Sequence, residues 1–191
     1  MTGPDLLPLP VHAEPVRPEW IDYNGHLSEA YYVLVFGHAT DALMDHAGLD
    51  ADYRRRTGCS LYTVEAHVRY LREVPQGSAL TVRTRLLGVA GGKAHFTHEM
   101  YAAPGPSTAD AARGAAGAGD APAGGGVGGG VGGGDQAVPP GELVATEELF
   151  ALHVDQHTGR TTPLPQPVLA RLLPHVEPAP RWAGRGIRSI A

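Results

Sequence analysis

The sequence is poor in cysteine, in positive charge and in long hydrophobic runs. Cys59 is the single cysteine of 191 residues, which excludes an internal disulfide and a zinc site built on several thiolates. Lys and Arg number 15 against 20 Asp and Glu, so a basic face for nucleic acid is not expected. No apolar run approaches the roughly 20 residues of a membrane span, and the N-terminal stretch does not have a secretory signal pattern. We therefore expect a cytoplasmic protein without nucleic-acid or membrane partners.

Glycine and proline, in contrast, are abundant, and much of the glycine lies in one segment. Of the 38 positions from Pro104 to Gly141, 14 are glycine, and Gly124 to Gly134 reads GGGVGGGVGGG. Such a composition cannot build a core. We expect one domain over 1–191 with a Gly/Pro/Ala-rich low-complexity insertion at about 104–141. A tolerated loop is favoured over a lid, because the segment has almost no aromatic or charged residue with which to hold a ligand.

One long helix is predicted from Ser28 to about His46, where apolar residues recur at intervals of three and four. The hydroxyl of Ser28 is suited to cap the free N–H groups of the first turn. Gly48 is suited to end the helix, because glycine adopts the left-handed conformation at little cost.

Five strands are predicted around this helix by apolar alternation and turn residues. They are Val11 to Val16, Leu61 to Val74, Leu80 to Val89, Lys93 to Ala102 and Glu142 to Val154, with a short tail helix around Val168 to Leu173. Gly91-Gly92 predicts a tight hairpin, and the insertion falls at a hairpin tip. One helix can cover five antiparallel strands only if the sheet curls around it, so the expected fold is α+β with a curled sheet.

Polar reactive groups are densest between the first strand and the long helix. The segment from Trp20 to Glu29 reads WIDYNGHLSE, with an acid, an amide and an imidazole at Asp22, Asn24 and His26. The free N–H groups and the dipole of a helix start can stabilise an oxyanion. A carboxylate beside them could attack an acyl carbon or activate water. A polar turn that only caps backbone groups is the alternative interpretation.

The motif Asp22-x-x-Gly25-His26, followed by Tyr31-Tyr32, resembles the signature of the hotdog-fold acyl thioesterases related to 4-hydroxybenzoyl-CoA thioesterase. The resemblance implies a hotdog fold in which a five-stranded sheet wraps one central helix. It also implies acyl-CoA hydrolysis without a cofactor, sites built at the interface of a homodimer or larger oligomer, and Asp22 as nucleophile or base. The backbone N–H near Glu29 would polarise the thioester carbonyl, and Tyr32 would be the helix tyrosine of the family.

Asp22-x-Asn24-x-His26 is also similar to the triplet of the plant acyl carrier protein thioesterases, in which the amide and imidazole position the acyl group and water. This similarity implies catalytic roles for Asn24 and His26. Two departures stand out: Ser28-Glu29 replaces the usual Asn-Asn, and Arg69 occupies the place of a catalytic glutamate by hand alignment.

Four segments are similar to the betainyl-CoA thioesterases of carnitine breakdown. They are WIDYNGHL from Trp20, SLYTVE from Ser60, YLREV from Tyr70 and LHVDxxTGR from Leu152. The implied substrate has a quaternary ammonium head, which favours aromatic rings and acids. The candidates for this contact are Trp20, Tyr23, Tyr31, Tyr62, Glu29 and Glu65, although for any single ring a place in the core is favoured, because large aromatic side chains usually serve packing.

Glu65 is a second acid on the polar face of its predicted strand. It is a candidate general acid or base if it faces the partner subunit's site, and a solvated side chain otherwise. His153-x-Asp155-x-His157 permits a zinc interpretation, which we do not favour because the thioesterase resemblance accounts for the segment without a metal. The alternatives to hydrolysis are a non-catalytic acyl-CoA-binding hotdog protein and an acyl-CoA hydratase.

Overall fold

The structure is a computed structural model that describes residues 8–105 and 139–184. Its strands are β1 (Val11–Pro15), β2 (Cys59–Tyr70), β3 (Ser78–Ala90), β4 (Lys93–Pro104), β5 (Glu142–Asp155) and β6 (Arg160–Thr161). Its helices are α1 (Glu29–Ala47), α2 (Ala51–Thr57) and α4 (Gln166–Leu172), with short 3₁₀ turns η1 (Pro18–Trp20) and η2 (Leu173–His175). The predicted long helix and the five strands are therefore confirmed, while α2 and the two-residue β6 were not predicted.

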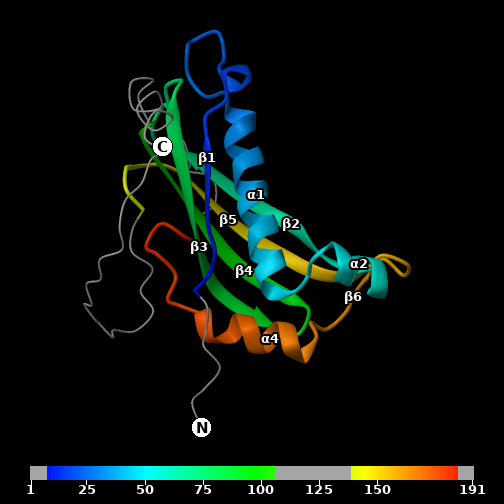
Figure 1. Cartoon of the computed structure of the whole chain (residues 1–191). Coiled ribbons are helices and arrows are strands. Elements are labelled where there is room, and N and C mark those ends of the chain that lie inside the picture. The colour runs from blue at the N-terminus through cyan, green and yellow to red at the C-terminus, as the bar shows by residue number, and fades with distance from the viewer. Residues whose placement is uncertain (1–7, 106–138, 185–191) are drawn as a thin grey trace, which may run out of the picture.

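All strand pairs are antiparallel, in the order β1-β3-β4-β5-β2, with β6 beside β5. The sheet curls and α1 lies along its hollow (Figure 1). Gly91 and Gly92 connect β3 to β4, and Gly91 has φ +56°, which suits glycine. Most of the predicted insertion, residues 106–138, lies outside the described residues, between β4 and β5. The described part of the chain contains no helix long and apolar enough to cross a membrane.

The ends of α1 are formed differently from each other. Gly48 ends the helix in the left-handed conformation, as predicted, and the guanidinium of Arg171 from α4 donates to the carbonyl oxygen of Ala47 at 3.1 Å. Ser28 precedes the helix with extended backbone, but its hydroxyl accepts no hydrogen bond from the first turn. The predicted side-chain cap at Ser28 was therefore wrong.

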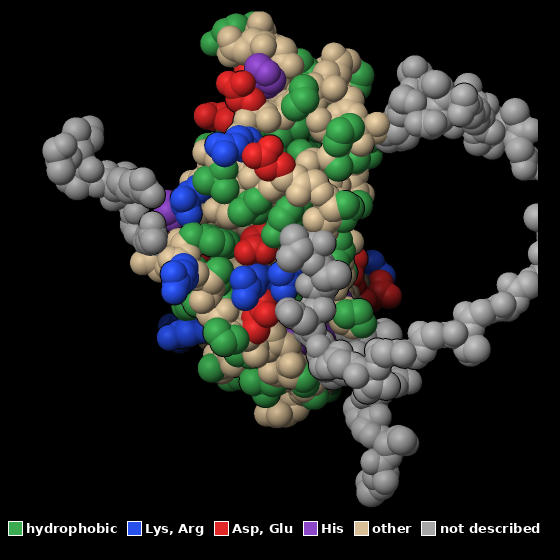
Figure 2. Space-filling view, turned by 90° about the vertical axis from the view of Figure 1, so that its left-hand side faces the viewer, with side chains coloured by type: hydrophobic (Ala, Val, Ile, Leu, Met, Phe, Trp, Pro, Cys, Tyr) green, Lys and Arg blue, Asp and Glu red, His purple; other side chains and the backbone are tan. Residues whose placement is uncertain are grey.

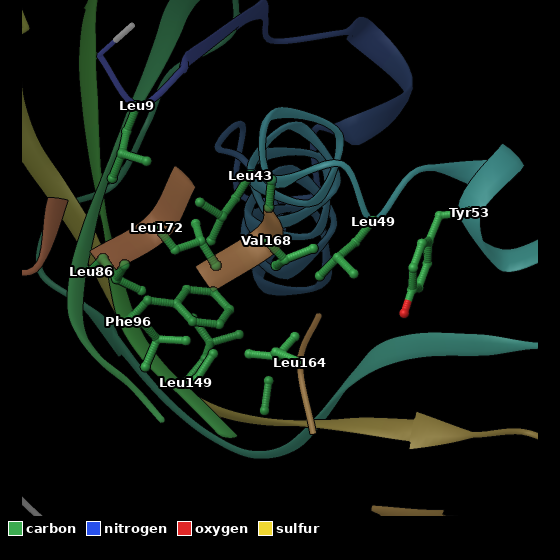
Figure 3. Close-up of a cluster of buried hydrophobic side chains, with 14 residues drawn as sticks. Leu9, Leu43, Leu49, Tyr53, Leu86, Phe96, Leu149, Leu164, Val168 and Leu172 are labelled. Carbon is green, nitrogen blue, oxygen red and sulfur yellow. The ribbon is translucent and has the colours of Figure 1, made fainter. Parts of the chain in front are cut away.

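Two apolar clusters fill the hollow of the sheet. One surrounds the end of α1 and includes Leu164, Val168 and Leu172, which come from α4 and the segment before it (Figure 3). The other surrounds the start of α1 and includes Trp20 and Tyr32. Burial of such side chains contributes roughly 1.5–3 kcal/mol each, which fixes α1 and the loop before it on the sheet.

A polar row crosses the core beneath the middle of α1. The ring of His98 on β4 bonds through one nitrogen to the Thr40 hydroxyl at 2.9 Å and through the other to the Thr84 hydroxyl at 3.0 Å. Burial lowers the pKa of His98 to about 3, so its ring is neutral. Its neighbour across the ladder is Glu147 of β5, which is 4% exposed and makes no hydrogen bond within the described residues. Burial raises the pKa of Glu147 to about 7.

Strand β2 departs from the prediction in two ways. It begins at Cys59 and ends at Tyr70, four residues before the predicted end at Val74. The register also shifts between Thr63 and Glu65, so that these residues face opposite sides of the sheet. The alternation predicted for Leu61 to Val74 is therefore interrupted near Val64 and does not run unbroken through the strand.

The outer face of β3 and β4 carries charges of both signs. Arg85 lies 3.5 Å from Glu99 and also pairs with Glu177 near the C-terminal end of the described chain. On the face turned to the viewer in Figure 2, basic and acidic side chains lie side by side, and neither sign forms a continuous patch.

Candidate active site

A short hairpin loop holds the predicted catalytic residues just before α1. Its ends are joined by a bridge between Ile21 and Leu27, and the amide of Asp22 donates to the carbonyl oxygen of His26 at 2.9 Å. Gly25 turns the chain with φ +83°, which a residue with a side chain rarely adopts. The amide of Leu27 then donates to Val74 at 2.8 Å, which fixes the loop against the segment after β2.

The carboxylate of Asp22 is held by its own loop. Its Oδ1 accepts from the backbone N–H of Asn24 at 2.8 Å and of His26 at 3.4 Å, while Oδ2 accepts from the side-chain amide of Asn24 at 3.4 Å. The bond from the Asn24 N–H is the largest influence, and together these contacts hold the pKa of Asp22 below its usual range. Asp22 is therefore ionised at neutral pH, as a nucleophile or general base must be.

The loop opens on a pocket of about 580 Å³ between the start of α1 and the end of β2. The lining residues are Asp22, Asn24, His26, Leu27, Glu29, Tyr32, Tyr70, Leu71, Arg72 and Glu73. Five of the nine predicted site residues, namely Asp22, Asn24, His26, Glu29 and Tyr32, thus come together around one cavity.

The far wall of the pocket comes from the chain directly after β2. Tyr32 donates from its hydroxyl to the carbonyl oxygen of Arg72 at 3.1 Å, and its ring meets Tyr70 edge to face with centroids 5.3 Å apart. Burial raises the pKa of Tyr32 to about 12, so the hydroxyl keeps its proton and donates. Nε2 of His26 lies 3.5 Å from a carboxylate oxygen of Glu73.

Tyr70, Arg72 and Glu73 did not appear among the predicted site residues. The sequence did contain a signal, because YLREV from Tyr70 to Val74 is one of the segments that resemble the betainyl-CoA thioesterases. The predicted strand ran on to Val74, which placed these residues in a ladder. In the structure the amides of Leu71 and Arg72 both donate to Val144, and the chain turns into the pocket wall.

Four predicted residues lie away from this pocket. Trp20 is 3% exposed and stacks on Tyr31 with centroids 5.4 Å apart, within the core. Tyr23 is 97% exposed. Tyr62 and Glu65 lie on the exposed part of β2, where Glu65 borders a second hollow beside His95 and Glu148. The substrate-binding and catalytic roles assigned to these residues stay predictions.

His153, Asp155 and His157 do not form a metal-binding cluster in the part of the chain that the structure describes. The ring of His153 is buried, and its two nitrogens face the hydroxyl of Tyr53 at 2.9 Å and the carbonyl oxygen of Thr162 at 3.0 Å. Asp155 instead accepts the N–H of His157 at 2.8 Å within a turn.

Comparison with known proteins decides the family. Residues 16–172 match the model of the thioesterase-like superfamily. The chain belongs to this superfamily. It is a thioester hydrolase with the hotdog fold, and the curled five-stranded sheet around one long helix confirms the fold predicted from the motif.

Its relatives include two named proteins. The chain is 36% identical to betainyl-CoA thioesterase of Pseudomonas aeruginosa over 184 residues, which cover 94% of each protein. It is 39% identical over 188 residues to L-carnitine dehydrogenase/betainyl-CoA thioesterase of Agrobacterium fabrum, but it spans only 31% of that longer protein.

Two solved structures share the fold. A putative thioesterase of Pseudomonas putida superposes with a TM-score of 0.65 at 31% identity, covering 97% of this chain and 99% of the other. A Staphylococcus aureus protein solved in complex with CoA superposes with a TM-score of 0.70 at 20% identity, covering 94% of each chain.

Proposed function

We propose that this enzyme is a cytoplasmic homodimer that hydrolyses a CoA thioester with a cationic acyl group, betainyl-CoA, to the free acid and CoA. The observation that carries the proposal is the composition of the pocket wall. Three carboxylates, from Asp22, Glu29 and Glu73, face the same cavity as the rings of Tyr32 and Tyr70. The named relatives that act on betainyl-CoA support the same substrate.

This wall suits a quaternary ammonium group for a physical reason. Such a cation has no N–H, so it cannot be bound by hydrogen bonds and is instead attracted by ring faces and negative charge. Among the described residues that line the pocket, Arg72 is the one Lys or Arg, and its guanidinium is paired with Glu142 at 2.9 Å. The described side chains that line the pocket therefore have a net negative charge.

Asp22 performs the chemistry in this proposal, by one of two routes. As a base it takes a proton from water, the hydroxide attacks the thioester carbonyl carbon, and the tetrahedral intermediate expels CoA thiolate, which then takes up the proton. As a nucleophile it attacks the carbonyl carbon itself, releases the thiolate and forms an anhydride that water cleaves. Both routes need the ionised carboxylate that the loop provides.

The start of α1 supplies the oxyanion site. Glu29 is the first residue of the helix, so its N–H has no acceptor within the helix and can donate to the thioester oxygen. Asn24 and His26 border the same cavity and position the acyl group and water.

A second copy of the chain completes the enzyme. Strand β2 forms one edge of the sheet, and three of its side chains, Tyr62, Val64 and Tyr70, are 41%, 54% and 48% exposed. Val33 and Leu34 of α1 are exposed to 44% and 42%. An open edge with large apolar side chains favours pairing with another strand. Pairing along β2 would bring Tyr62 and Glu65 to the interface, where their predicted roles apply.

The test is release of free thiol from betainyl-CoA and from tert-butylacetyl-CoA, which has the same shape but carbon in place of the charged nitrogen. We expect betainyl-CoA to be hydrolysed at least about tenfold more efficiently, since a desolvated cation–π contact contributes about 2 kcal/mol. Equal rates would contradict the proposed preference for a cationic acyl group, although thioester hydrolysis itself would still be supported. CoA binding without thiol release from either would favour a binding protein, and hydration of an enoyl-CoA would favour a hydratase.

A further inference from the structure

Strand β1 carries polar residues on the side that faces the helix. His12 and Glu14 alternate with exposed Val11 and Ala13. The usual pattern, with apolar side chains on the inner face and polar side chains on the outer face, is therefore reversed. Their ladder partners on β3, Val82 and Leu80, are buried core residues, which shows that His12 and Glu14 point to the inner side of the sheet. Packing alone would favour apolar residues at these two positions.

A third ligand-type side chain meets them from α1. Nδ1 of His38 lies 2.7 Å from Oε1 of Glu14, and Nε2 of His12 lies 2.9 Å from the same oxygen. All three atoms lie within 4.8 Å of one another. The side chains of His12, Glu14 and His38 are 23%, 10% and 35% exposed, so the group is half-buried and reachable from solvent.

We propose that His12, Glu14 and His38 bind a divalent first-row transition metal ion, Zn²⁺ in preference to Mg²⁺ or Ca²⁺. Two imidazole nitrogens and one carboxylate oxygen are a donor set typical of zinc, whereas magnesium and calcium prefer oxygen alone. In a tetrahedral zinc site neighbouring ligand atoms lie about 3.3 Å apart, given metal–ligand distances of about 2.0–2.1 Å. Small outward movements of the two rings reach that spacing, and water supplies the fourth ligand.

The same contacts would also arise if the two imidazoles simply donated hydrogen bonds to Glu14. Both ring nitrogens lie within hydrogen-bond distance of the same carboxylate oxygen, Oε1 of Glu14, so this oxygen can accept either the two hydrogens or a metal. Metal binding requires each ring to carry its hydrogen on the opposite nitrogen, which a neutral imidazole permits.

The metal would tie the edge strand to the central helix. Strand β1 continues through Val16, whose amide donates to Ser78 at 2.9 Å, into η1 and the Asp22 loop. None of the three ligands borders the pocket around Asp22. We therefore assign the metal a structural role, separate from the proposed hydrolysis.

The experiment uses the full chain without a histidine tag, stripped of metal by a chelator and dialysed. Titration with Co²⁺ should give the intense visible absorption of four-coordinate cobalt, and calorimetry with Zn²⁺ should give one ion per chain. Saturating Zn²⁺ should raise the melting temperature by about 5 °C, because ligand binding to the folded state adds stability. His12→Gln and His38→Gln should each weaken Zn²⁺ binding at least about tenfold.

His95→Gln is the matched control, because His95 lies 2.8 Å from Glu148 on the outer face, and no third ligand-type side chain among the described residues completes a cluster there. It should bind Zn²⁺ like the unsubstituted chain. Arg17→Gln should bind more tightly, since Arg17 lies 3.9 Å from the other oxygen of Glu14 and repels a cation. Hydrolysis by the stripped protein should be unchanged, so the metal site and the proposed function can fail separately.

Three outcomes would overturn the proposal: no stoichiometric Zn²⁺ binding, equal binding by the His12→Gln and His38→Gln variants, or a weak cobalt spectrum of the octahedral aqueous type. If the variants do not fold, the cobalt spectrum of the unsubstituted chain decides, because it reports four-coordinate binding directly.

Discussion

The rings of Tyr32 and Tyr70 meet edge to face, with centroids 5.3 Å apart, in the wall of the pocket that Asp22 also borders. One ring belongs to the central helix and the other to the end of β2, so this contact joins two elements far apart in the sequence. In our proposal the pair forms the aromatic side of the cation site.

Tyr70→Leu should therefore reduce selectivity for the cationic substrate. Leucine keeps apolar bulk but has no ring quadrupole, so kcat/KM for betainyl-CoA should fall about tenfold while that for tert-butylacetyl-CoA changes little. Thiol-release kinetics with both substrates measure the effect. Tyr23→Leu tests the predicted role of a ring that is 97% exposed and lies outside the pocket lining, and unchanged selectivity there would place the cation contact at Tyr70 and not at Tyr23. An equal loss for both substrates would mean that Tyr70 only shapes the cavity.

Asp22→Asn should abolish hydrolysis by about three orders of magnitude or more while CoA thioester binding is retained. The amide oxygen can still accept the N–H of Asn24, so the loop should keep its shape. The lowered pKa of Asp22 also predicts that acid inhibits turnover by the unsubstituted enzyme only below the pH range in which an ordinary aspartate takes up its proton, and a pH profile of thiol release measures this. Turnover unchanged in the variant would remove Asp22 from the mechanism.

The periodicity of apolar residues in the sequence was sufficient to predict the long helix and the five main strands. The run from Ser28 to His46 has helical spacing over five turns, and the later strands have clear turns between them, so local pattern and tertiary structure agree. The Asp22 loop was found for a similar reason. Its functional groups lie within five successive residues, Asp22 to His26, and the bridge from Ile21 to Leu27 closes the loop around them.

What the sequence did not reveal depends on contacts between distant segments or on weak local signals. The bulge near Val64 is invisible to alternation, because an extra apolar residue fits either face. Helix α2 buries Tyr53 alone and carries three arginines, too little apolar pattern for a prediction. The pocket wall at Arg72 forms because the backbone amides of Leu71 and Arg72 donate to the carbonyl oxygen of Val144. Val144 belongs to β5, which is distant in the sequence.

Val64→Arg should convert the proposed dimer to a monomer. The side chain is 54% exposed on the β2 edge, and a charge at each copy of this position would place like charges together in a two-fold interface. Sedimentation or light scattering should show half the mass, with turnover strongly reduced. Val11→Arg on the opposite edge is the control, since Val11 is 46% exposed on β1. A dimeric Val64→Arg protein would place the interface elsewhere.

Deletion of residues 106–138 should leave turnover unchanged and the melting temperature equal or slightly higher. Strands β4 and β5 are already paired as far as Ala102 and Glu142, close to both ends of the segment. A shorter connection lowers the entropic cost of closing the hairpin by about 2 kcal/mol. Thermal melts and thiol-release assays test this together. A marked loss of either stability or turnover would show that the segment packs on the domain or acts at the site.

Glu147→Gln should stabilise the protein above neutral pH. In the folded chain the pKa of Glu147 is raised to about 7 by burial, from an ordinary value of 4.5. Between these values the folded state binds more protons than the unfolded state, so stability falls as the pH rises from about 4.5 to 7. The cost to the free energy of unfolding above pH 7 is about 3 kcal/mol, and the uncharged amide avoids it.

Urea unfolding at about pH 5 and pH 8 should show the Glu147→Gln variant close in stability to the unsubstituted chain at pH 5 and clearly more stable at pH 8. Glu65→Gln, on the exposed part of β2, should show no such gain. A gain that is equal at both pH values would mean that packing, rather than the charge of a buried carboxylate, sets the difference.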